Sequence, residues 1–278
     1  MTESGWSWDP SLYEGSAAYY ARGGRVPYPA GVVDALVAAE GLDGSGRLLD
    51  VGCGPGSLTL LLAPRFAEVT GVDADPEMLT EAARLAVEAE VTNVTWRQLR
   101  GEDLPADLGG YRMVTFAQSF HWMDRPRVAA AVRGMLEDGG TCVHVHAVTH
   151  EGTATERALA HPQPPRDAIA ELVRRYLGPT RRAGVGSLPG GTPGGEDDVY
   201  RAAGFTGPDR RTVAGRVVTR TADDMVASVF SLSSSTPRLF GDRFAAFEAE
   251  LRQLLLAASP AGAFSEYHRE IAVDLWRV

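Results

Sequence analysis

Leu48-Leu49-Asp50-Val51-Gly52-Cys53-Gly54-Pro55-Gly56-Ser57 is the stretch that decides the fold of this 278-residue chain. An aliphatic strand leads into three glycines at every second position, and the apolar run 58–63 continues as a helix. Glycine has no Cβ and adopts positive φ at little cost, so this loop lets a ligand lie directly against the backbone. In a parallel α/β sheet, ligands bind beyond the carboxyl ends of the strands, where such a loop stands.

The next segment, residues 68–73, predicts a second strand that ends in the carboxylate of Asp73. An acid at this point can accept hydrogen bonds from both hydroxyls of an adenosine ribose. The glycine spacing is not that of a dinucleotide fingerprint, because Ser57 stands where the last glycine would be. The chain also lacks the Gly-Lys-Ser/Thr of a P-loop, which excludes that class of nucleotide site.

Three segments together resemble the class I S-adenosylmethionine-dependent methyltransferases. They are the glycine loop, residues 72–79 (Val-Asp-Ala-Asp-Pro-Glu-Met-Leu) and residues 117–124 (Ala-Gln-Ser-Phe-His-Trp-Met-Asp). The third is similar to the His-Trp segment that follows the fourth strand in a small-molecule branch of the family, the type 11-like methyltransferases. The resemblance extends over residues 19–150, about half of the chain.

The resemblance implies an α/β fold: a seven-stranded, mostly parallel, doubly wound Rossmann-like sheet with an antiparallel last strand, an N-terminal arm and a helical cap. We expect a lid arm (1–30), a cofactor-binding core (31–150), a cap (151–197) and a C-terminal part that completes the sheet (198–278). Expected strands are 47–51, 68–72, 94–98, 112–118, 141–148, 210–219 and 271–278. Expected helices are 31–40, 58–63, 76–90, 124–135, most of 154–177, 196–203, 222–231 and 243–257.

The same resemblance implies S-adenosyl-L-methionine as the cofactor. The backbone of Gly52, Gly54 and Gly56 is expected to wrap its aminoacyl part and ribose, and Asp73 to hold the ribose diol. Asp50 either accepts a hydrogen bond from the ammonium group of the cofactor or orients the loop. Further cofactor contacts are expected from Tyr20, Arg25, Ala74, Met78, Gly101, Glu102, Gln118 and Trp122.

Several of these positions have a second reading. Arg25, or Arg22 in its place, pairs with the methionyl carboxylate, or the arm merely packs on the core. Met78 flanks the adenine or fills the core. Glu102 accepts from the adenine amine, or the ring is held by backbone at Gly101 alone, because Arg100 stands where the family has an acid.

Histidines supply the candidate catalytic groups. His121 is expected to act as a general base, since imidazole titrates near neutral pH, or else it closes the pocket wall with Trp122. Alternation in the expected strand 141–148 places His144, His146 and His150 on one side. A metal would need a carboxylate or a third histidine in register with His144 and His146, for which His150 is the candidate. We predict no metal site, and these side chains line the acceptor pocket or pack in the core.

The composition limits the partners. The net charge is −9, and all 27 basic residues are arginines without a basic run, which disfavours nucleic acid. Neither a signal-peptide pattern nor a membrane-spanning apolar stretch is present, and Cys53 and Cys142 do not suggest a disulfide framework. We expect a cytoplasmic protein. The apolar stripe of the helix 243–257 belongs to the core or to a homodimer interface.

These observations predict methyl transfer to a small organic acceptor, with natural-product tailoring as the preferred setting. One alternative is an enzyme of the same fold that binds the cofactor but catalyses another reaction, such as a cyclisation. A second is a nicotinamide-dependent oxidoreductase, which the missing last glycine disfavours. A non-enzymatic binding protein is the least favoured reading, because the glycine loop, the acid and the His-Trp segment occur together.

Overall fold

The computed structural model describes residues 9, 11–179, 182–183, 186–187 and 194–278. Contacts divide the chain into two compact units, which we call the larger unit (28–147, 192–214 and 270–278) and the smaller unit (1–27, 148–191 and 215–269). The division differs from the four consecutive parts expected above. The N-terminal arm, most of the cap segment and residues 215–269 belong to one unit.

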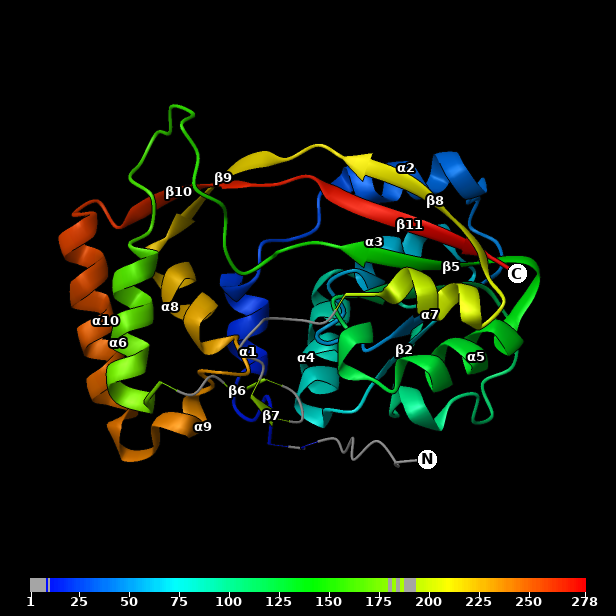
Figure 1. Cartoon of the computed structure of the whole chain (residues 1–278), viewed down its shortest axis with the longest axis horizontal. Coiled ribbons are helices and arrows are strands. Elements are labelled where there is room, and N and C mark those ends of the chain that lie inside the picture. Colours follow the sequence, from blue (N-terminus) through cyan, green and yellow to red (C-terminus); the bar gives the residue numbers. More distant parts are fainter. Residues whose placement is uncertain (1–8, 10, 180–181, 184–185, 188–193) are drawn as a thin grey trace. The chain divides into compact units, whose positions relative to one another are not determined.

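The larger unit contains a seven-stranded sheet, which confirms the expected fold. Its strand order is β3-β2-β1-β4-β5-β11-β8. The first five strands pair in parallel, whereas β11 runs antiparallel to both of its neighbours and lies between them (Figure 1). The strands are β3 (Val94–Gln98), β2 (Glu68–Asp73), β1 (Arg47–Val51), β4 (Tyr111–Ala117), β5 (Leu136–His146), β11 (Ile271–Arg277) and β8 (Thr206–Val213).

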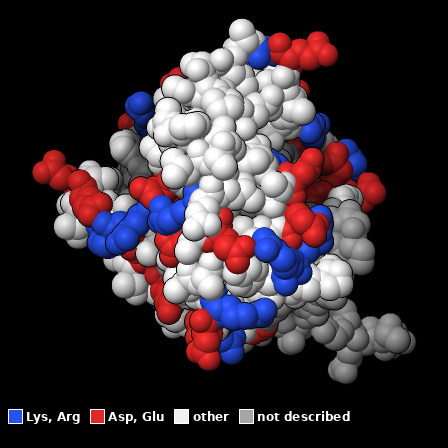
Figure 2. Space-filling model, turned by 90° about the vertical axis from the view of Figure 1, so that its left-hand side faces the viewer, with Lys and Arg blue, Asp and Glu red and all other residues white. Residues whose placement is uncertain are grey.

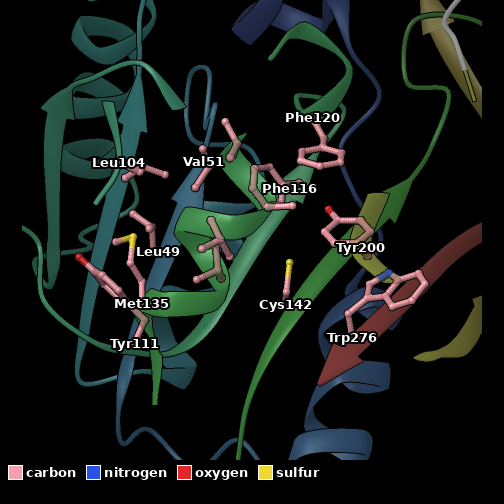
Figure 3. Close-up of a cluster of buried hydrophobic side chains, with 14 of the residues drawn as sticks. Leu49, Val51, Leu104, Tyr111, Phe116, Phe120, Met135, Cys142, Tyr200 and Trp276 are labelled. Carbon is pink, nitrogen blue, oxygen red and sulfur yellow. The ribbon is translucent and has the colours of Figure 1, made fainter. Parts of the chain in front are cut away.

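Helices cover both faces of this sheet. On one face, α2 (Ala30–Glu40) and α3 (Thr59–Leu62) bury a cluster with aliphatic side chains of β1, β5 and β11. On the other, α5 (Arg125–Met135) and α7 (Glu196–Ala202) pack on an aromatic cluster in which Tyr200 stacks between Phe120 and Trp276 (Figure 3). The alternation of β5 serves both clusters, because Cys142 faces one and Val143 the other.

Helix α4 (Pro76–Glu88) shows how the chain leaves β2. The side chain of Asp75 accepts hydrogen bonds from the backbone N–H groups of Glu77 and Met78, and Pro76 occupies the first helical position. This arrangement is a common helix start. It fixes the direction of the chain immediately after Asp73.

The smaller unit contains three packed helices, α6 (Arg166–Leu177), α8 (Ala222–Phe230) and α10 (Phe244–Ala258), and a hairpin of β9 (Arg216–Thr221) and β10 (Ala263–His268). The stripe expected on α10 is core, since Phe247, Leu251 and Leu255 are fully buried. The remaining elements are α1 (Ala17–Tyr19), η1 (Tyr20–Gly24), α9 (Pro237–Phe240), η5 (Gly241–Arg243), β6 (Arg182–Ala183) and β7 (Gly186–Ser187). Figure 2 shows a face of the molecule on which arginines lie among acidic side chains around a broad uncharged area.

Three expected elements were wrong in extent. The strand expected at 210–219 is two strands, β8 and β9, in different units; the break includes Gly215, where a Cβ would lie 2.5 Å from the Tyr267 hydroxyl. The helix expected over most of 154–177 begins only at Arg166, after a proline-rich stretch that disfavours helix. The strand expected at 141–148 is β5, which begins at Leu136 and ends at His146 and includes Gly139 at a φ of +76°.

The described helices include none that is both long and apolar enough to span a bilayer.

Candidate functional site

The glycine loop has a geometry that only glycine satisfies without strain. The φ angles of Gly52, Gly54 and Gly56 are +67°, +53° and +80°. A Cβ on Gly52 would lie 2.5 Å from Cβ of Ser119, and one on Gly56 would lie 2.8 Å from the Trp96 ring. A Cβ on Gly54 would meet no atom within 4 Å. The backbone at Gly54 is therefore open to a ligand, whereas the other two glycines are closed in by the fold.

Asp50 holds the base of this loop from inside the sheet. Its side chain is almost completely buried, and its two oxygens accept hydrogen bonds from the hydroxyls of Thr59 (2.5 Å) and Thr115 (2.8 Å). Burial raises the pKa of Asp50 against these two hydrogen bonds. The contacts are those of the loop-orienting alternative, and the bond to an ammonium group stays a prediction.

Removing one of these hydroxyls tests the role of Asp50. Thr59→Val is expected to lower the free energy of unfolding by about 1–3 kcal/mol, because it leaves a buried carboxylate oxygen without its donor. Denaturant unfolding measures the change. Thr80→Val, an exposed threonine on α4 whose hydroxyl bonds only to the Pro76 carbonyl, is the matched control. Equal stabilities of the two variants would contradict the assignment.

Asp73 lies at the end of β2, directly beside the open glycine. Its Oδ2 accepts a hydrogen bond from the Gly54 N–H (2.8 Å) and its Oδ1 accepts one from the Asp75 N–H (2.9 Å). Burial raises the pKa of Asp73 to about 6, helped by the charges of Asp75 and Asp50 and opposed by the two N–H groups. Each oxygen keeps a second lone pair for a ligand hydroxyl. The structure thus places the Asp73 carboxylate next to the open backbone of Gly54, as the sequence predicted for one ligand site.

The end of β4 is tied to the same loop by a residue that sequence reasoning missed. The Ser119 hydroxyl donates to the carbonyl of Val51 at 2.5 Å, immediately before Gly52. Gln118 has a φ of +61°, which is strained for a residue with a side chain, and its amide donates to the carbonyl of Val145 at 3.2 Å. Strained backbone of this kind concentrates at functional sites. A hydroxyl residue directly after an expected strand was the only available signal for Ser119.

The expected adenine contacts have other partners in this structure. One oxygen of Glu102 accepts from the Asp124 N–H at 2.9 Å, and the other lies 3.5 Å from Nε of Arg100. Gly101 packs against Met123, where a Cβ would lie 2.6 Å from the sulfur. These contacts join the turn η3 (Gly101–Asp103) to the start of α5. Contacts of Glu102 and Gly101 with adenine stay predictions.

Two further expected contacts lie at the start of α4. Met78 is buried in that helix, in line with the core reading. The carbonyl of Ala74 accepts a hydrogen bond from the Gln98 side chain at 3.3 Å. Neither observation tests a cofactor contact.

His121 and Trp122 form a ring pair in the 3₁₀ turn η4 (Phe120–Trp122), with ring centroids 4.8 Å apart. Burial, with a smaller effect of the Arg125 charge, lowers the pKa of His121 to about 4. An imidazole with this pKa is neutral at physiological pH and a weak proton acceptor. The geometry favours the structural alternative for His121, while its catalytic role stays a prediction.

The histidines of β5 have a different environment. The rings of His144 and His146 stack at 4.2 Å, and Nε2 of His146 lies 3.0 Å from Oδ2 of Asp274. Burial and the nearby His146 lower the pKa of His144 to about 3. His150 does not share this face. It lies beyond the end of β5, in the smaller unit, with its Nε2 3.5 Å from the Glu151 carboxylate.

The two expected cofactor contacts of the N-terminal arm lie together in the smaller unit. The Arg25 guanidinium lies over the Tyr20 ring at 4.4 Å and donates to the carbonyl of Ser231 at 2.8 Å. These contacts fit the packing alternative. The expected contacts of Tyr20 and Arg25 with the cofactor stay predictions.

Most of the residues of this site lie in the part of the chain that is similar to known proteins. Residues 48–140, which include the glycine loop, Asp73 and η4, match the family model described as a methyltransferase domain. An uncharacterized methyltransferase of Mycobacterium tuberculosis is 36% identical over 132 residues, which are 48% of this chain and 51% of that protein. A trans-aconitate 2-methyltransferase of Streptomyces avermitilis is 42% identical over 83 residues, which are 29% and 28% of the two chains.

The chain thus spans about half the length, or less, of these curated relatives. Among solved structures, that of a putative type II methyltransferase from Anaeromyxobacter dehalogenans matches with a TM-score of 0.51 and 21% identity. The match covers 91% of this chain and 96% of that one. At this identity the likeness shows the fold.

Proposed function

We propose that the protein transfers the methyl group of S-adenosyl-L-methionine to a small organic acceptor, because residues 48–140 match a methyltransferase domain and resemble the class I S-adenosylmethionine-dependent methyltransferases. The observation that carries the proposal is the open backbone at Gly54 beside the carboxylate of Asp73. Other turn glycines of the described chain, such as Gly44, also face open space. What distinguishes Gly54 is the carboxylate of Asp73, which accepts a hydrogen bond from its N–H at 2.8 Å and can also accept from ribose hydroxyls.

The fit assigns a role to each part of the site. Asp73 would accept hydrogen bonds from the ribose hydroxyls, and the backbone of the glycine loop would lie against the ribose and aminoacyl part. Gln118 would flank the aminoacyl end. When bound, the cofactor supplies an electrophilic methyl group on a sulfonium. The protein then has to align acceptor and methyl group and exclude water, which accounts for much of the rate in a displacement of this type.

The acceptor is proposed to be a small molecule. The printed name of one relative, trans-aconitate 2-methyltransferase, supports a small organic acceptor. The net charge of −9 without any lysine disfavours a nucleic acid. A tailoring step in natural-product synthesis, a cytoplasmic location, the absence of a membrane partner and a homodimer remain parts of this proposal that rest on the sequence.

Calorimetry and labelled transfer test the proposal in sequence. We expect S-adenosylhomocysteine to bind with measurable heat and NAD not to bind. Transfer of a labelled methyl group is then measured with trans-aconitate and a panel of phenols. Binding of NAD alone would favour the oxidoreductase alternative. Binding of S-adenosylhomocysteine without methyl transfer to any acceptor would favour an enzyme of the same fold with another reaction.

The pKa of Asp73 predicts how cofactor binding depends on pH. The raised pKa of about 6 means that the carboxylate is ionised above pH 6 and gains a proton below it. Protonation turns one acceptor site of the carboxylate into an O–H donor, so the ionised form is the better acceptor for two hydroxyls. The affinity for S-adenosylhomocysteine is therefore expected to be constant above this pH and to fall about tenfold for each unit below it. A pH series of titrations checks this, and an unchanged affinity down to about pH 4.5 would contradict it.

A further inference from the structure

Three neighbouring strands of the larger unit carry a chain of charged groups that no expected role explains. The Asp274 carboxylate of β11 is fully buried, and Nε and one terminal nitrogen of Arg210, on β8, donate to its two oxygens at 2.6 Å each. His146, the last residue of β5, lies 3.0 Å from the same carboxylate through Nε2. The order Arg210, Asp274, His146 thus crosses the sheet from its edge inward.

The electrostatics of this chain fix the state of the imidazole. Burial raises the pKa of Asp274, but the hydrogen bonds from Arg210 and His146 outweigh it and hold the pKa well below its usual range. An ionised Asp274 requires a proton on Nε2 of His146, which leaves Nδ1 bare as a proton acceptor.

The position of His146 places it at the edge of the sheet where ligands bind. Val145, the residue before it, pairs with Ala117 at the end of β4, and its carbonyl accepts from Gln118. Ser119, which follows Gln118, donates a hydrogen bond to the carbonyl of Val51, the last residue of β1 before the glycine loop. The His146 side chain is 37% exposed. In a parallel sheet, groups at adjacent carboxyl ends face one site.

The other histidines of the larger unit are less suited to accept a proton. Burial lowers the pKa of both His121 and His144, and neither has a hydrogen-bonded carboxylate among the described contacts. His146 interacts electrostatically with His144 on β5 and Asp274 on β11. Further groups interact with these neighbours: His121 of η4 with His144, Asp197 of α7 with Arg210, and Tyr200 of α7 with Asp274. Asp274 is the one that contacts Nε2 of His146 directly.

We propose that His146 is the general base of this site, that Asp274 and Arg210 are its positioning residues, and that the acceptor is a neutral hydroxyl of a phenol or enol. The inference rests on the proposed function. In the step, a bond forms between the acceptor oxygen and the methyl carbon, and the bond from that carbon to the sulfonium sulfur breaks with its electrons going to sulfur. The proton of the hydroxyl goes to Nδ1 of His146. A carboxylate acceptor is already ionised and would need no such base.

The first test measures the tautomer of the His146 imidazole directly by NMR and needs no methyl acceptor. In the whole protein with ¹⁵N-labelled histidine, the His146 resonances are assigned by their loss in His146→Gln. We expect the neutral ring to carry its proton on Nε2, with Nδ1 bare. In Asp274→Asn this fixed tautomer is expected to give way to a mixture. A proton on Nδ1 in the wild-type protein would overturn the proposal.

The second test measures labelled methyl transfer at about pH 8 to phenol, which like the tyrosine side chain keeps its proton there, and to 4-nitrophenol, which is largely ionised. His146→Gln is expected to slow transfer to phenol about 100-fold or more and transfer to 4-nitrophenol by less than about threefold. Binding of S-adenosylhomocysteine should not change. His161→Gln, in the smaller unit, is the matched control.

The outcomes separate the inference from the proposed function. Equal effects of His146→Gln on the two acceptors, or no effect on either, would overturn the base assignment and leave methyl transfer standing. No transfer by the wild-type protein to any acceptor, despite cofactor binding, would overturn the proposed function and the base with it. If Asp274→Asn does not fold, Arg210→Gln tests the same hydrogen-bonded series of Arg210, Asp274 and His146, because Arg210 is half-exposed. This variant is expected to slow methyl transfer to phenol but not to 4-nitrophenol.

Discussion

Replacing Asp73 by alanine is expected to weaken binding of S-adenosylhomocysteine by at least about 100-fold. The variant loses the acceptor of two ribose hydroxyls, and hydrogen bonds to a charged group contribute about 1.5–3 kcal/mol each. It also loses the bonds from the backbone N–H groups of Gly54 and Asp75, which hold the loop and the start of α4 in place. Isothermal titration calorimetry measures the change directly.

A residue of the same strand provides the control for this variant. Glu68 begins β2, is exposed, and its carboxylate lies 3.3 Å from the Arg47 guanidinium in a surface ion pair. Such pairs contribute little to stability, so Glu68→Ala is expected to bind S-adenosylhomocysteine like the wild-type protein. If Asp73→Ala is folded and binds the ligand within about threefold of wild type, the carboxylate does not hold the ribose and the proposed cofactor site is wrong.

Gly54→Ala is expected to abolish cofactor binding while leaving the fold nearly intact. A Cβ at this position meets no protein atom within 4 Å, so its cost to stability is limited to about 1–2 kcal/mol for the left-handed backbone. The added methyl group would instead occupy the space in which a ligand lies against the loop. Thermal unfolding and calorimetry with S-adenosylhomocysteine, applied to the same preparation, separate the two effects.

Alanine variants of two other glycines provide comparisons for Gly54→Ala. Gly44 also has a positive φ (+90°) and no atom within 4 Å of an added Cβ, but it lies in the exposed connection before β1. Gly44→Ala should show a similar loss of stability and normal binding. Gly52→Ala should be the least stable of the three, because its Cβ would lie 2.5 Å from that of Ser119. Normal binding by a folded Gly54→Ala would show that the opening is not a ligand site.

The local parts of the fold could be predicted because the information lies within a few residues. The strand before Gly52, the acid at the end of β2 and the cap at Asp75 follow from short patterns whose hydrogen bonds are made nearby. Errors arose where two patterns compete over a short distance. The pattern on both sides of Gly215 predicts one strand, whereas in the structure β8 ends before this glycine, which lies so close to Tyr267 that no side chain would fit.

The candidate site also contains residues that short sequence patterns predict and residues whose roles depend on distant contacts. The sequence identified Gly52, Gly54, Gly56 and Asp73, whose roles depend on backbone conformation and on adjacent parallel strands. It gave Asp50 two alternatives, and the contacts with Thr59 and Thr115, which only the structure shows, are those of the loop-orienting one. It left His121 as either a general base or a pocket-wall residue, and burial makes that imidazole a weak proton acceptor.

By itself, the sequence determined the sheet, the glycine loop and the position of the acid at the end of β2. Only the tertiary structure decided which histidine has a carboxylate behind it. His146 and Asp274 are 128 residues apart in the chain, and Arg210 and Asp274 are 64 apart. These three meet because β11 inserts antiparallel between β5 and β8, and that pairing depends on hydrogen bonds and packing across the whole sheet rather than on any short pattern.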